Sequence, residues 1–339
     1  MTFENFKRIL ITGATGSFGK IFLERILNLE QSPERIVVFS RDELKQWDLQ
    51  QKYPRDKYPQ LRFFLGDIRD KDRLNFALNG IDTVVHAAAL KQVPAAEYNP
   101  MEFIKTNVYG VDNLIKACLE TDVERLVALS TDKAASPINL YGATKLCGEK
   151  LMISANNIKG NKKIKISVVR YGNVMGSRGS VIPYFLETAK KGFIPITHEE
   201  MTRFNISLDN AVDMVLWTLK ESFGGEIVVP KIPSYKIVDL ANAIGPNCEH
   251  KIMGIRSGEK LHEELITSSE SLTTLDIGKY YLIFPSDRNI LDRYKKTNNH
   301  YKEINKQFSY NSMENNEFLS IEKLRELIKE NVDSNFKYI

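Results

Sequence analysis

Short apolar runs recur through the first half of the chain, and each is followed by a turn and a stretch of helical spacing. Five runs have the length and aliphatic content of buried strands: Arg8–Thr12, Ile36–Phe39, Leu61–Leu65, Asp82–His86 and Arg125–Leu129. Strands that alternate with helices predict a doubly wound parallel sheet, and a sixth run at 164–170 extends it. We therefore predict an α/β fold.

The pattern changes after residue 175, where the expected elements become shorter: Met201–Phe204, Val228–Pro233 and Ile255–Glu263. From Ser286 to about Asn316 the chain is polar and rich in Asn and Lys, which predicts a loop or a loosely packed segment. A last helix is expected near 320–332, with four apolar residues on one face: Ile321, Leu324, Leu327 and Ile328. We predict a first domain over 1–175, to which some later segments return, and a smaller lobe with a tail over 176–339.

Composition narrows the possible functions. The 339 residues are 42% hydrophobic and 27% charged, and the formal net charge of +4 comes from interleaved lysines and glutamates. No basic block suggests nucleic-acid binding. The three cysteines, Cys118, Cys147 and Cys248, are far apart, so neither a disulfide scaffold nor a metal site is expected. Without a long apolar run or a signal-like N-terminus, we predict a cytoplasmic protein.

A glycine-rich turn follows the first strand and opens the first helix. Its sequence is Gly13-Ala14-Thr15-Gly16-Ser17-Phe18-Gly19. Strand, glycine turn and helix in this order are typical of a dinucleotide site, because the backbone can approach a pyrophosphate and the helix N-terminus offers free N–H groups. The alternative is an ordinary tight β–α turn without a ligand.

The end of the second strand bears on the choice of cofactor. An NAD site usually has an acid here, whereas an NADP site uses an arginine for the 2′-phosphate. Ser40 and Arg41 come first in this sequence, so NADP is favoured. Asp42 is the acid that follows, and its alternative role is to cap the next helix.

Further candidates stand at the ends of the third and fourth strands. Asp67 is placed to accept a hydrogen bond from an adenine amino group, and capping of the next helix is its alternative role. The small residues Ala87 and Ala88 would let a flat cofactor lie against the backbone. His86 closes an apolar run and is interpreted as a structural histidine.

The fifth strand leads into the stretch with the most chemistry. Thr131, Asp132 and Lys133 follow the apolar run directly, and Tyr141 and Lys145 lie at i and i+4 at the start of a helix. Open α/β sheets bind ligands at the carboxyl ends of their strands. Lys145 is expected to lower the pKa of Tyr141, because a neighbouring positive charge favours the phenolate. The alternative for Asp132 and Lys133 is a surface ion pair.

These motifs resemble the extended short-chain dehydrogenase/reductase superfamily, in which the sheet is of Rossmann type. Four segments are similar to UDP-N-acetylglucosamine 4,6-dehydratases, in particular to the soluble C5-inverting enzymes that start pseudaminic acid biosynthesis: Ser40–Glu43, His86–Lys91, Ser130–Ala135 and Arg170–Val174. The similarity extends to Phe308–Ser312 and Asn315–Leu319. Ser257 and Phe318 depart from the usual proline and tryptophan, both away from the reacting groups.

The resemblance implies roles for the central residues. Tyr141 would take the O4 proton while C4 gives hydride to NADP, with Thr131 hydrogen-bonded to O4 and Lys145 to the nicotinamide ribose. Asp132 would be the general acid for the leaving hydroxyl at C6. Lys133 would be the base at C5, so its pKa should be depressed.

The resemblance also implies two sets of binding residues. For NADP they are Gly13, Thr15, Gly16, Ser17, Phe18, Gly19, Ser40, Arg41, Asp42, Lys45, Asp67, Ile68, Ala87, Ala88, Lys91, Asn107, Tyr141, Lys145 and Val174. For UDP-N-acetylglucosamine they are Lys91, Asn173, Ser177, Arg178, Gly179, Ser180, Val181, Arg203, Arg256 and Glu259. Arginines suit a pyrophosphate because a guanidinium binds two oxygens at once.

Three alternatives stay open. A UDP-hexose 4-epimerase would need Tyr141, Lys145 and a hydroxyl but would leave Asp132 and Lys133 without a role. A C5-retaining 4,6-dehydratase would use an Asp-Glu pair where this chain has Asp132 and Lys133. A non-enzymatic NADP sensor would be expected to lack the Tyr-x-x-x-Lys pair. The resemblance further implies a homo-oligomer.

Overall fold

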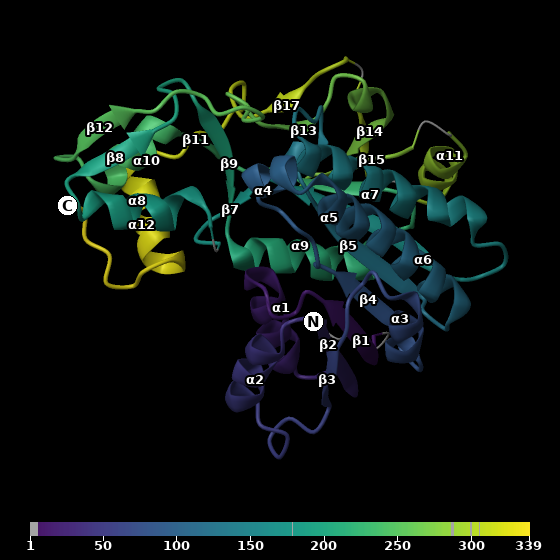
Figure 1. Cartoon of the computed structure of the whole chain (residues 1–339). Coiled ribbons are helices and arrows are strands. Elements are labelled where there is room, and N and C mark those ends of the chain that lie inside the picture. Colours follow the sequence, from purple (N-terminus) through teal and green to yellow (C-terminus); the bar gives the residue numbers. More distant parts are fainter. Residues whose placement is uncertain (1–5, 178, 286–287, 299, 305) are drawn as a thin grey trace.

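A large twisted sheet organises the computed structural model, which describes residues 6–177, 179–285, 288–298, 300–304 and 306–339 (Figure 1). Among these residues the sheet has ten strands in the order β16-β14-β15-β10-β6-β5-β4-β1-β2-β3. The parallel part comprises β1 (Arg8–Thr12), β2 (Arg35–Ser40), β3 (Leu61–Leu65), β4 (Thr83–His86), β5 (Arg125–Thr131), β6 (Lys165–Tyr171) and β10 (Ile227–Pro230). The predicted doubly wound parallel sheet is confirmed.

The other three strands of the sheet come from the last quarter of the chain. They are β14 (Thr274–Asp276), β15 (Tyr280–Ile283) and β16 (Lys302–Glu303). β15 pairs antiparallel with β10, and β14 pairs antiparallel with both β15 and β16. Segments far along the chain therefore return to the first sheet.

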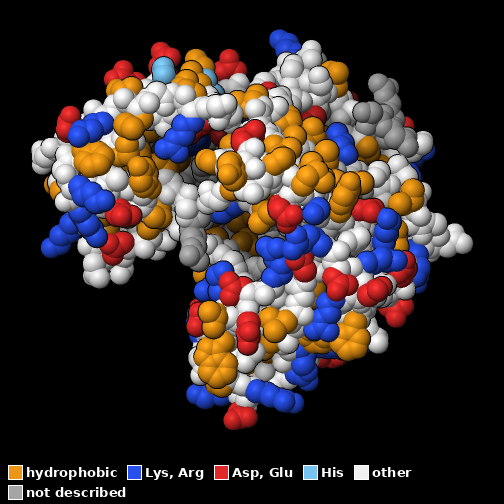
Figure 2. Space-filling view, viewed as in Figure 1, with side chains coloured by type: hydrophobic (Ala, Val, Ile, Leu, Met, Phe, Trp, Pro, Cys, Tyr) orange, Lys and Arg blue, Asp and Glu red, His pale blue; other side chains and the backbone are white. Residues whose placement is uncertain are grey.

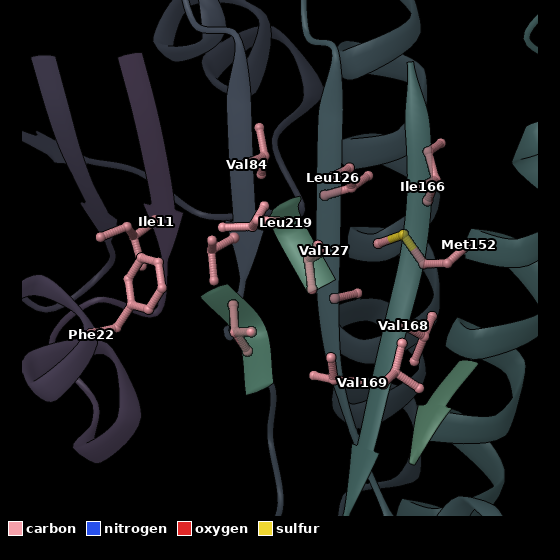
Figure 3. Close-up of a cluster of buried hydrophobic side chains, with 14 of the residues drawn as sticks. Ile11, Phe22, Val84, Leu126, Val127, Met152, Ile166, Val168, Val169 and Leu219 are labelled. Atoms are coloured by element: carbon pink, nitrogen blue, oxygen red, sulfur yellow. The ribbon is translucent and has the colours of Figure 1, made fainter. Parts of the chain in front are cut away.

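Helices cover both faces of the sheet and bury its aliphatic side chains. On one face α1 (Ser17–Leu27) packs against α9 (Leu208–Glu221). On the other, α3 (Lys71–Leu78), α6 (Gly110–Glu120) and α7 (Leu140–Ile158) pack in series. Helix α2 (Glu43–Lys52) contacts β2 and lies beside α1, to which an ion pair of Lys52 and Glu24 joins it (Figure 1). Figure 3 shows Phe22, Met152 and Leu219 from three helices among the strand residues of this core.

A helix is expected from about Asn107 to Cys118, and a π-helical turn (Lys105–Tyr109) that runs directly into α6 covers this range. Two short helices precede the turn, α4 (Val93–Tyr98) and α5 (Pro100–Ile104). π-helical turns inside α-helices occur frequently at functional sites. Here the turn carries Asn107, one of the predicted cofactor residues.

A second core lies in a smaller lobe. It includes α8 (Val181–Ala189), α10 (Ile237–Ile244), α12 (Ile321–Asn331) and the parallel pair β8 (Phe193–Ile196) and β12 (Glu249–Ile252). The sheet of β7 (Asn173–Val174), β9 (Thr202–Ile206) and β11 (Ser234–Lys236) stands beside it. The predicted last helix is confirmed, with Leu324 and Ile328 fully buried. Figure 2 shows the surface hollowed between this lobe and the part that holds α1.

The prediction of a loop from Ser286 to Asn316 is wrong in part. Residues 286–287, 299 and 305 lie outside the described residues, but the segment contains α11 (Arg288–Thr297), β16 and β17 (Tyr310–Asn311). Ile290, Leu291 and Tyr294 enter the large core from α11, although Asn, Asp, Arg and Lys surround them in sequence. β17 pairs with β13 (Glu264–Ile266). No helix in the described ranges is both long and apolar enough to cross a bilayer.

Candidate active site

The carboxyl end of β5 positions the first three candidate side chains. β5 lies between β4 and β6, and its last residue is Thr131. A single 3₁₀ turn (Asp132–Ala134) follows, and the Thr131 side chain accepts a hydrogen bond from Lys133 N. The Thr131 hydroxyl also donates to Asp132 Oδ1 at 2.8 Å. The turn thus fixes Thr131, Asp132 and Lys133 at a strand end, as predicted from the sequence.

Helix α7 presents the next two candidates. Asn139 caps it by accepting a hydrogen bond from Gly142 N at 2.8 Å, which starts the helix one residue before Tyr141. A Cβ at Gly142 would lie 2.2 Å from the Lys133 carbonyl oxygen. Only glycine therefore lets the helix approach the 3₁₀ turn so closely. This contact brings Tyr141 and Lys145 to the same strand end as Asp132 and Lys133.

Burial dominates the pKa values of the helix pair. It raises the pKa of Tyr141 to about 12, against the lowering effects of the Lys133 charge and of a hydrogen bond with Thr131. Burial also lowers the pKa of Lys145 to about 8, and its Nζ donates to the Leu129 carbonyl at 2.7 Å. The prediction that Lys145 lowers the pKa of Tyr141 therefore differs from the structure, in which Lys133 supplies the positive charge.

Lys133 differs from the prediction more strongly. Its Nζ lies 3.1 Å from Asp132 Oδ1 and 3.0 Å from Glu263 Oε1. Burial alone would lower the pKa of Lys133, but the two carboxylates outweigh it and raise that pKa. The expected depression of the Lys133 pKa is wrong for this arrangement. The ion pair with Asp132 exists, but the Asp132 side chain is 1% exposed, so it is no surface pair.

Asp132 and Glu263 are two buried carboxyl groups in different environments. Burial raises the pKa of Asp132, which favours its neutral, proton-donating form. Burial would do the same to Glu263, but Lys133 and Arg203 outweigh it and lower the Glu263 pKa. Glu263 lies 130 residues from Lys133 and no local motif marks it, so its place in this cluster is not predictable from the sequence.

The glycine turn packs closely against the backbone that follows β4. Gly13 has a φ of +69°, and a Cβ there would lie 2.7 Å from Ala88 N. A Cβ at Gly19 would lie 2.5 Å from the Ala14 backbone. The turn is therefore pressed against the predicted small residues after β4, and Gly16 is the N-cap of α1. Ser17 and Phe18 form its first turn, and Thr15 lies in the loop before it.

His86 and Thr12 join this turn to the sheet. The Thr12 hydroxyl lies 2.7 Å from His86 Nδ1, and both side chains are buried. Burial, followed by the charge of Lys145, lowers the pKa of His86 to about 3, so the ring is neutral. This agrees with the interpretation of His86 as a structural histidine.

The residues at the end of β2 that are candidates for binding the adenosine part of the cofactor have different surroundings. Gln46 donates to the Ser40 carbonyl and hydroxyl, which holds buried Ser40 in the fold. Asp42 caps α2 by accepting from Lys45 N, and Lys45 Nζ forms an ion pair with the same carboxylate. The capping alternative for Asp42 is therefore observed. Arg41 is half exposed at this strand end, 3.5 Å from Asp67.

Asp67 does not cap the helix that follows it. Asp67 accepts hydrogen bonds from the backbone and the side chain of Arg69. The N-cap of α3 is Asp70, which accepts from Arg73 N. The capping alternative for Asp67 is thus wrong. Ile68 beside it is buried against Gly110 of α6.

Asn107 connects two parts of the site. Its amide donates to the Leu90 carbonyl at 2.9 Å and to Thr144 at 3.1 Å, and it accepts from Leu90 N at 2.9 Å. It therefore joins the Leu90–Lys91 loop to α7. Burial, followed by the charge of Lys133, lowers the pKa of Lys91.

The predicted substrate residues come together only in part. Arg203 and Glu259 form an ion pair at 3.5 Å, and Arg203 also donates to the carbonyls of Lys260 and Leu261. Arg256 is exposed. Asn173 and Val174 form β7, next to β9, which carries Arg203.

Residues on either side of position 178 lead into α8, and Gly179 among them lies against Gln92. Ser180 is the N-cap of α8 and Val181 its first residue, while Ser177 precedes the turn. Gly179 has a φ of +75°, and a Cβ there would lie 2.7 Å from Gln92 Nε2. Arg178 lies outside the described residues, so its predicted role stays a prediction.

The sheet, the glycine turn and the pair Tyr141 and Lys145 define a Rossmann-fold protein of the extended short-chain dehydrogenase/reductase class. The chain belongs to the family described as "Polysaccharide biosynthesis protein", whose model matches residues 9–285. In the described ranges, no group of three or more His, Cys, Asp or Glu side chains is arranged to hold a metal ion.

Two curated relatives from Campylobacter jejuni are named UDP-N-acetylglucosamine 4,6-dehydratase (inverting). The relative from strain NCTC 11168 is 54% identical over 284 residues, which are 83% of this chain and 84% of the relative. The relative from strain 81-176 is 49% identical over 330 residues, 96% and 98% of the two chains. The resemblance seen in the sequence is confirmed. The solved structure of Pen from Bacillus thuringiensis, 36% identical, covers 97% of this chain and 99% of its own, with a TM-score of 0.87.

Two further comparisons bear on the alternatives. A Rickettsia felis relative named UDP-glucose 4-epimerase is 40% identical over 329 residues, 95% of each chain. The structure of DesIV, a dTDP-glucose 4,6-dehydratase from Streptomyces venezuelae with NAD and TYD bound, is 22% identical with a TM-score of 0.66. It covers 75% of this chain and 86% of its own, and at this identity it supports the fold alone.

Proposed function

We propose that the chain is an inverting UDP-N-acetylglucosamine 4,6-dehydratase that uses NADP. The observation that carries the proposal is the cluster at the end of β5. A buried carboxyl with a raised pKa (Asp132) and a lysine amine (Lys133) stand beside the redox pair Tyr141 and Lys145. The names of the two Campylobacter relatives support the same reaction.

The residues present fit a nicotinamide dinucleotide. The glycine turn, which packs against the backbone of Ala87 and Ala88, and the N-terminus of α1 suit a pyrophosphate. Arg41 at the end of β2 suits a 2′-phosphate, so NADP is the proposed form. When bound, the cofactor supplies a hydride acceptor at C4 of the sugar and a hydride donor at C6. Fluorescence titration with NADP and NAD, in wild type and Arg41→Ala, tests the choice of cofactor.

Each proton transfer has a residue at hand. Tyr141 takes the O4 proton, which requires its pKa to fall from about 12, and Thr131 and Lys133 act in that direction. Lys133 takes the C5 proton as a neutral amine, which requires its pKa, raised by Asp132 and Glu263, to fall. Asp132, whose pKa burial raises, gives a proton to the departing C6 hydroxyl. Reprotonation of C5 from the opposite face would give the inverted 4-keto-6-deoxy sugar.

The smaller lobe is the proposed site of the nucleotide sugar. Arg203 and Glu259 already lie together there, and Lys91, Asn173 and the loop 177–181 lie on adjoining segments. Residues 1–175, with the returning strands β10 and β14 to β16, would bind the dinucleotide. Residues 176–339 would form the side of the binding site that holds the nucleotide sugar.

A 4-epimerase is the main competing function, since the Rickettsia relative carries that name. An epimerase would need no acid and base for elimination, yet Asp132 and Lys133 stand at the reacting end of β5. Incubation with UDP-N-acetylglucosamine, followed by ¹H NMR, should show a new C6 methyl signal. UDP-N-acetylgalactosamine alone would favour the epimerase, and tight NADP binding without turnover would favour a sensor.

The stereochemistry at C5 needs its own variant. Lys133→Glu places an Asp-Glu pair after Thr131, as in the retaining enzymes. We expect this variant to oxidise C4 but to lose inversion, which the coupling constants of the product report. An unchanged product would count against Lys133 as the base.

The proposed enzyme is a homo-oligomer. Large apolar side chains, among them Tyr98, Met101 and Tyr109, are exposed on α4, α5 and the π-helical turn. Light scattering coupled to size-exclusion chromatography measures the mass, and a monomer would contradict this part of the proposal.

A further inference from the structure

Glu263 is the member of the catalytic cluster that the proposed function leaves without a role. Its Oε1 lies 3.0 Å from Lys133 Nζ and 3.7 Å from Arg203 Nε. Its side chain is 2% exposed, and its Oε2 accepts no hydrogen bond from the described residues. A carboxylate is unfavourable in such a place unless cations compensate it. The contact with Lys133 is therefore the feature that needs an explanation.

The backbone around Glu263 is held at several points. Glu263 N donates to the Ser312 hydroxyl at 2.9 Å, and Ser312 N donates to the Glu263 carbonyl at 2.8 Å. Two residues on, the Leu265 carbonyl accepts from buried Arg170 at 2.9 Å. Ser312 ends the Phe308–Ser312 stretch, for which the sequence analysis found no role. That stretch thus fixes Glu263, and a group on fixed backbone can position another side chain accurately.

Lys133 is the open member of this cluster. Its side chain is 25% exposed, against 1% for Asp132 and 2% for Glu263. The amine is therefore the most accessible charged group of the three, and the two carboxylates lie 3.1 Å and 3.0 Å from it. The charged and titratable groups that act on Lys133, or on which it acts, are Asp132, Glu263, Arg203, Lys91, Tyr141, Tyr235 and Lys260.

We propose that Glu263 is a positioning residue for the elimination: it holds the Lys133 amine beside Asp132 and sets the pH range in which that amine can act. The inference rests on the proposed function. In the step, the neutral Lys133 amine takes the C5 proton and the C5–H electrons form the C5–C6 double bond. The C6–O bond breaks, and Asp132 protonates the leaving hydroxyl to give water.

Glu263→Gln separates the charge of this side chain from its shape. Without the negative charge the ammonium is less favoured, so the neutral amine exists at lower pH. We expect the acidic limb of the kcat profile to move to lower pH by about one unit or more. Glu263→Asp, which shortens the side chain but keeps the charge, should lower kcat with little effect on KM and leave the limb in place.

Glu264→Gln is the matched control. Glu264 is the next residue, and its carboxylate accepts from the hydroxyls of Ser136 and Ser309 instead of contacting Lys133. Its profile should match the wild type. Thermal unfolding shows which variants fold. If Glu263→Gln does not fold, the effect of Glu263→Asp on kcat and KM tests the role of Glu263.

A titration of Lys133 that needs no turnover tests the role of Glu263 separately from the proposed function. Reductive ¹³C-methylation gives each lysine an NMR signal whose shift follows its titration, and Lys133→Arg identifies the Lys133 signal. In wild type this lysine should titrate above the exposed lysines, and in Glu263→Gln at lower pH. Equal titration and equal kcat profiles in both proteins would overturn the role of Glu263. Absence of dehydration in wild type would overturn the proposed function, while the NMR titration still decides the role of Glu263.

Discussion

Tyr141 and Lys145 lie one helical turn apart, yet burial is the largest cause of the pKa shift of each. Burial raises the pKa of Tyr141 to about 12 and lowers the pKa of Lys145 to about 8. Both shifts favour the neutral form, as expected where water is excluded. The Lys145 Nζ donates a hydrogen bond to the Leu129 carbonyl, so its amine is fixed independently of Tyr141.

The depressed pKa of Lys145 predicts a pH-dependent cost to stability. The unfolded chain binds this proton more tightly, so stability should rise with pH between about 8 and 10.5. Lys145→Met removes the buried charge and should raise the free energy of unfolding at pH 7 by up to about 3 kcal/mol, while abolishing turnover. The gain should shrink towards pH 10.5.

Urea unfolding at pH 7 and at pH 10 measures this difference. Lys150→Met changes an exposed lysine on the same helix and should alter stability little at either pH. An equal effect of Lys145→Met at both pH values would contradict the assignment of the shift to Lys145.

Asp132→Asn should divide the proposed reaction in two. The variant keeps the size of the buried side chain but cannot protonate the leaving hydroxyl. We expect C4 oxidation to proceed and elimination to stop, so that kcat falls by about 10²–10⁴ and reduced cofactor accumulates. Stopped-flow absorbance at 340 nm detects it. Tyr141→Phe should show no such signal, and normal turnover of Asp132→Asn would exclude Asp132 as the acid.

At the scale of elements, Arg170 connects three segments that are distant in sequence. From β6 it donates to both oxygens of Glu149 on α7, to both oxygens of Glu270 and to the Leu265 carbonyl of β13. Arg170 is fully buried, and Glu149 nearly so. Helix α7 is thereby joined to the strand that begins beside Glu263.

Arg170→Met should destabilise the protein strongly. It would leave the Glu149 carboxylate buried without its cation, a loss of about 3–5 kcal/mol in comparable sites. Lys71→Met breaks the exposed pair of Lys71 and Glu120 and should cost no more than about 1 kcal/mol. Differential scanning calorimetry compares the two variants. Similar small effects would mean that Arg170 contributes less than its contacts indicate.

The same scale shows which parts of the fold a sequence can predict. Buried strands such as Ile36–Phe39 are apolar throughout, so their pattern is local and was predicted correctly. Helix α11 has only a few apolar residues, and they are buried because distant Gly225 and Phe223 lie against them. Glu263 was missed for a similar reason, since the contact with Lys133 depends on Ser312 and Arg170. Local motifs place residues at a strand end, but partners from distant segments decide their protonation.

Across the whole molecule, the C-terminal segment contacts both cores. β17 pairs with β13, and the Ser312 hydroxyl bonds Thr202 of β9 as well as Glu263 N. Leu319 N then donates to the Ser234 carbonyl of β11, and α12 enters the smaller lobe (Figure 1). The tail therefore connects the catalytic cluster to the lobe proposed to hold the nucleotide sugar.

This arrangement predicts that damage to α12 affects one ligand and not the other. Leu324 and Ile328 are fully buried in the second core. Leu324→Ala and Ile328→Ala should each lower the free energy of unfolding of that lobe by about 2–5 kcal/mol, and the double variant combines the two losses. Calorimetric titration should then show weakened binding of UDP, while the Kd for NADP changes less than about twofold. Lys329→Ala, at an exposed position of the same helix, should leave both affinities unchanged. Parallel loss of both affinities in the double variant would mean that the two cores unfold together, and the proposed division near residue 175 would then have no energetic basis.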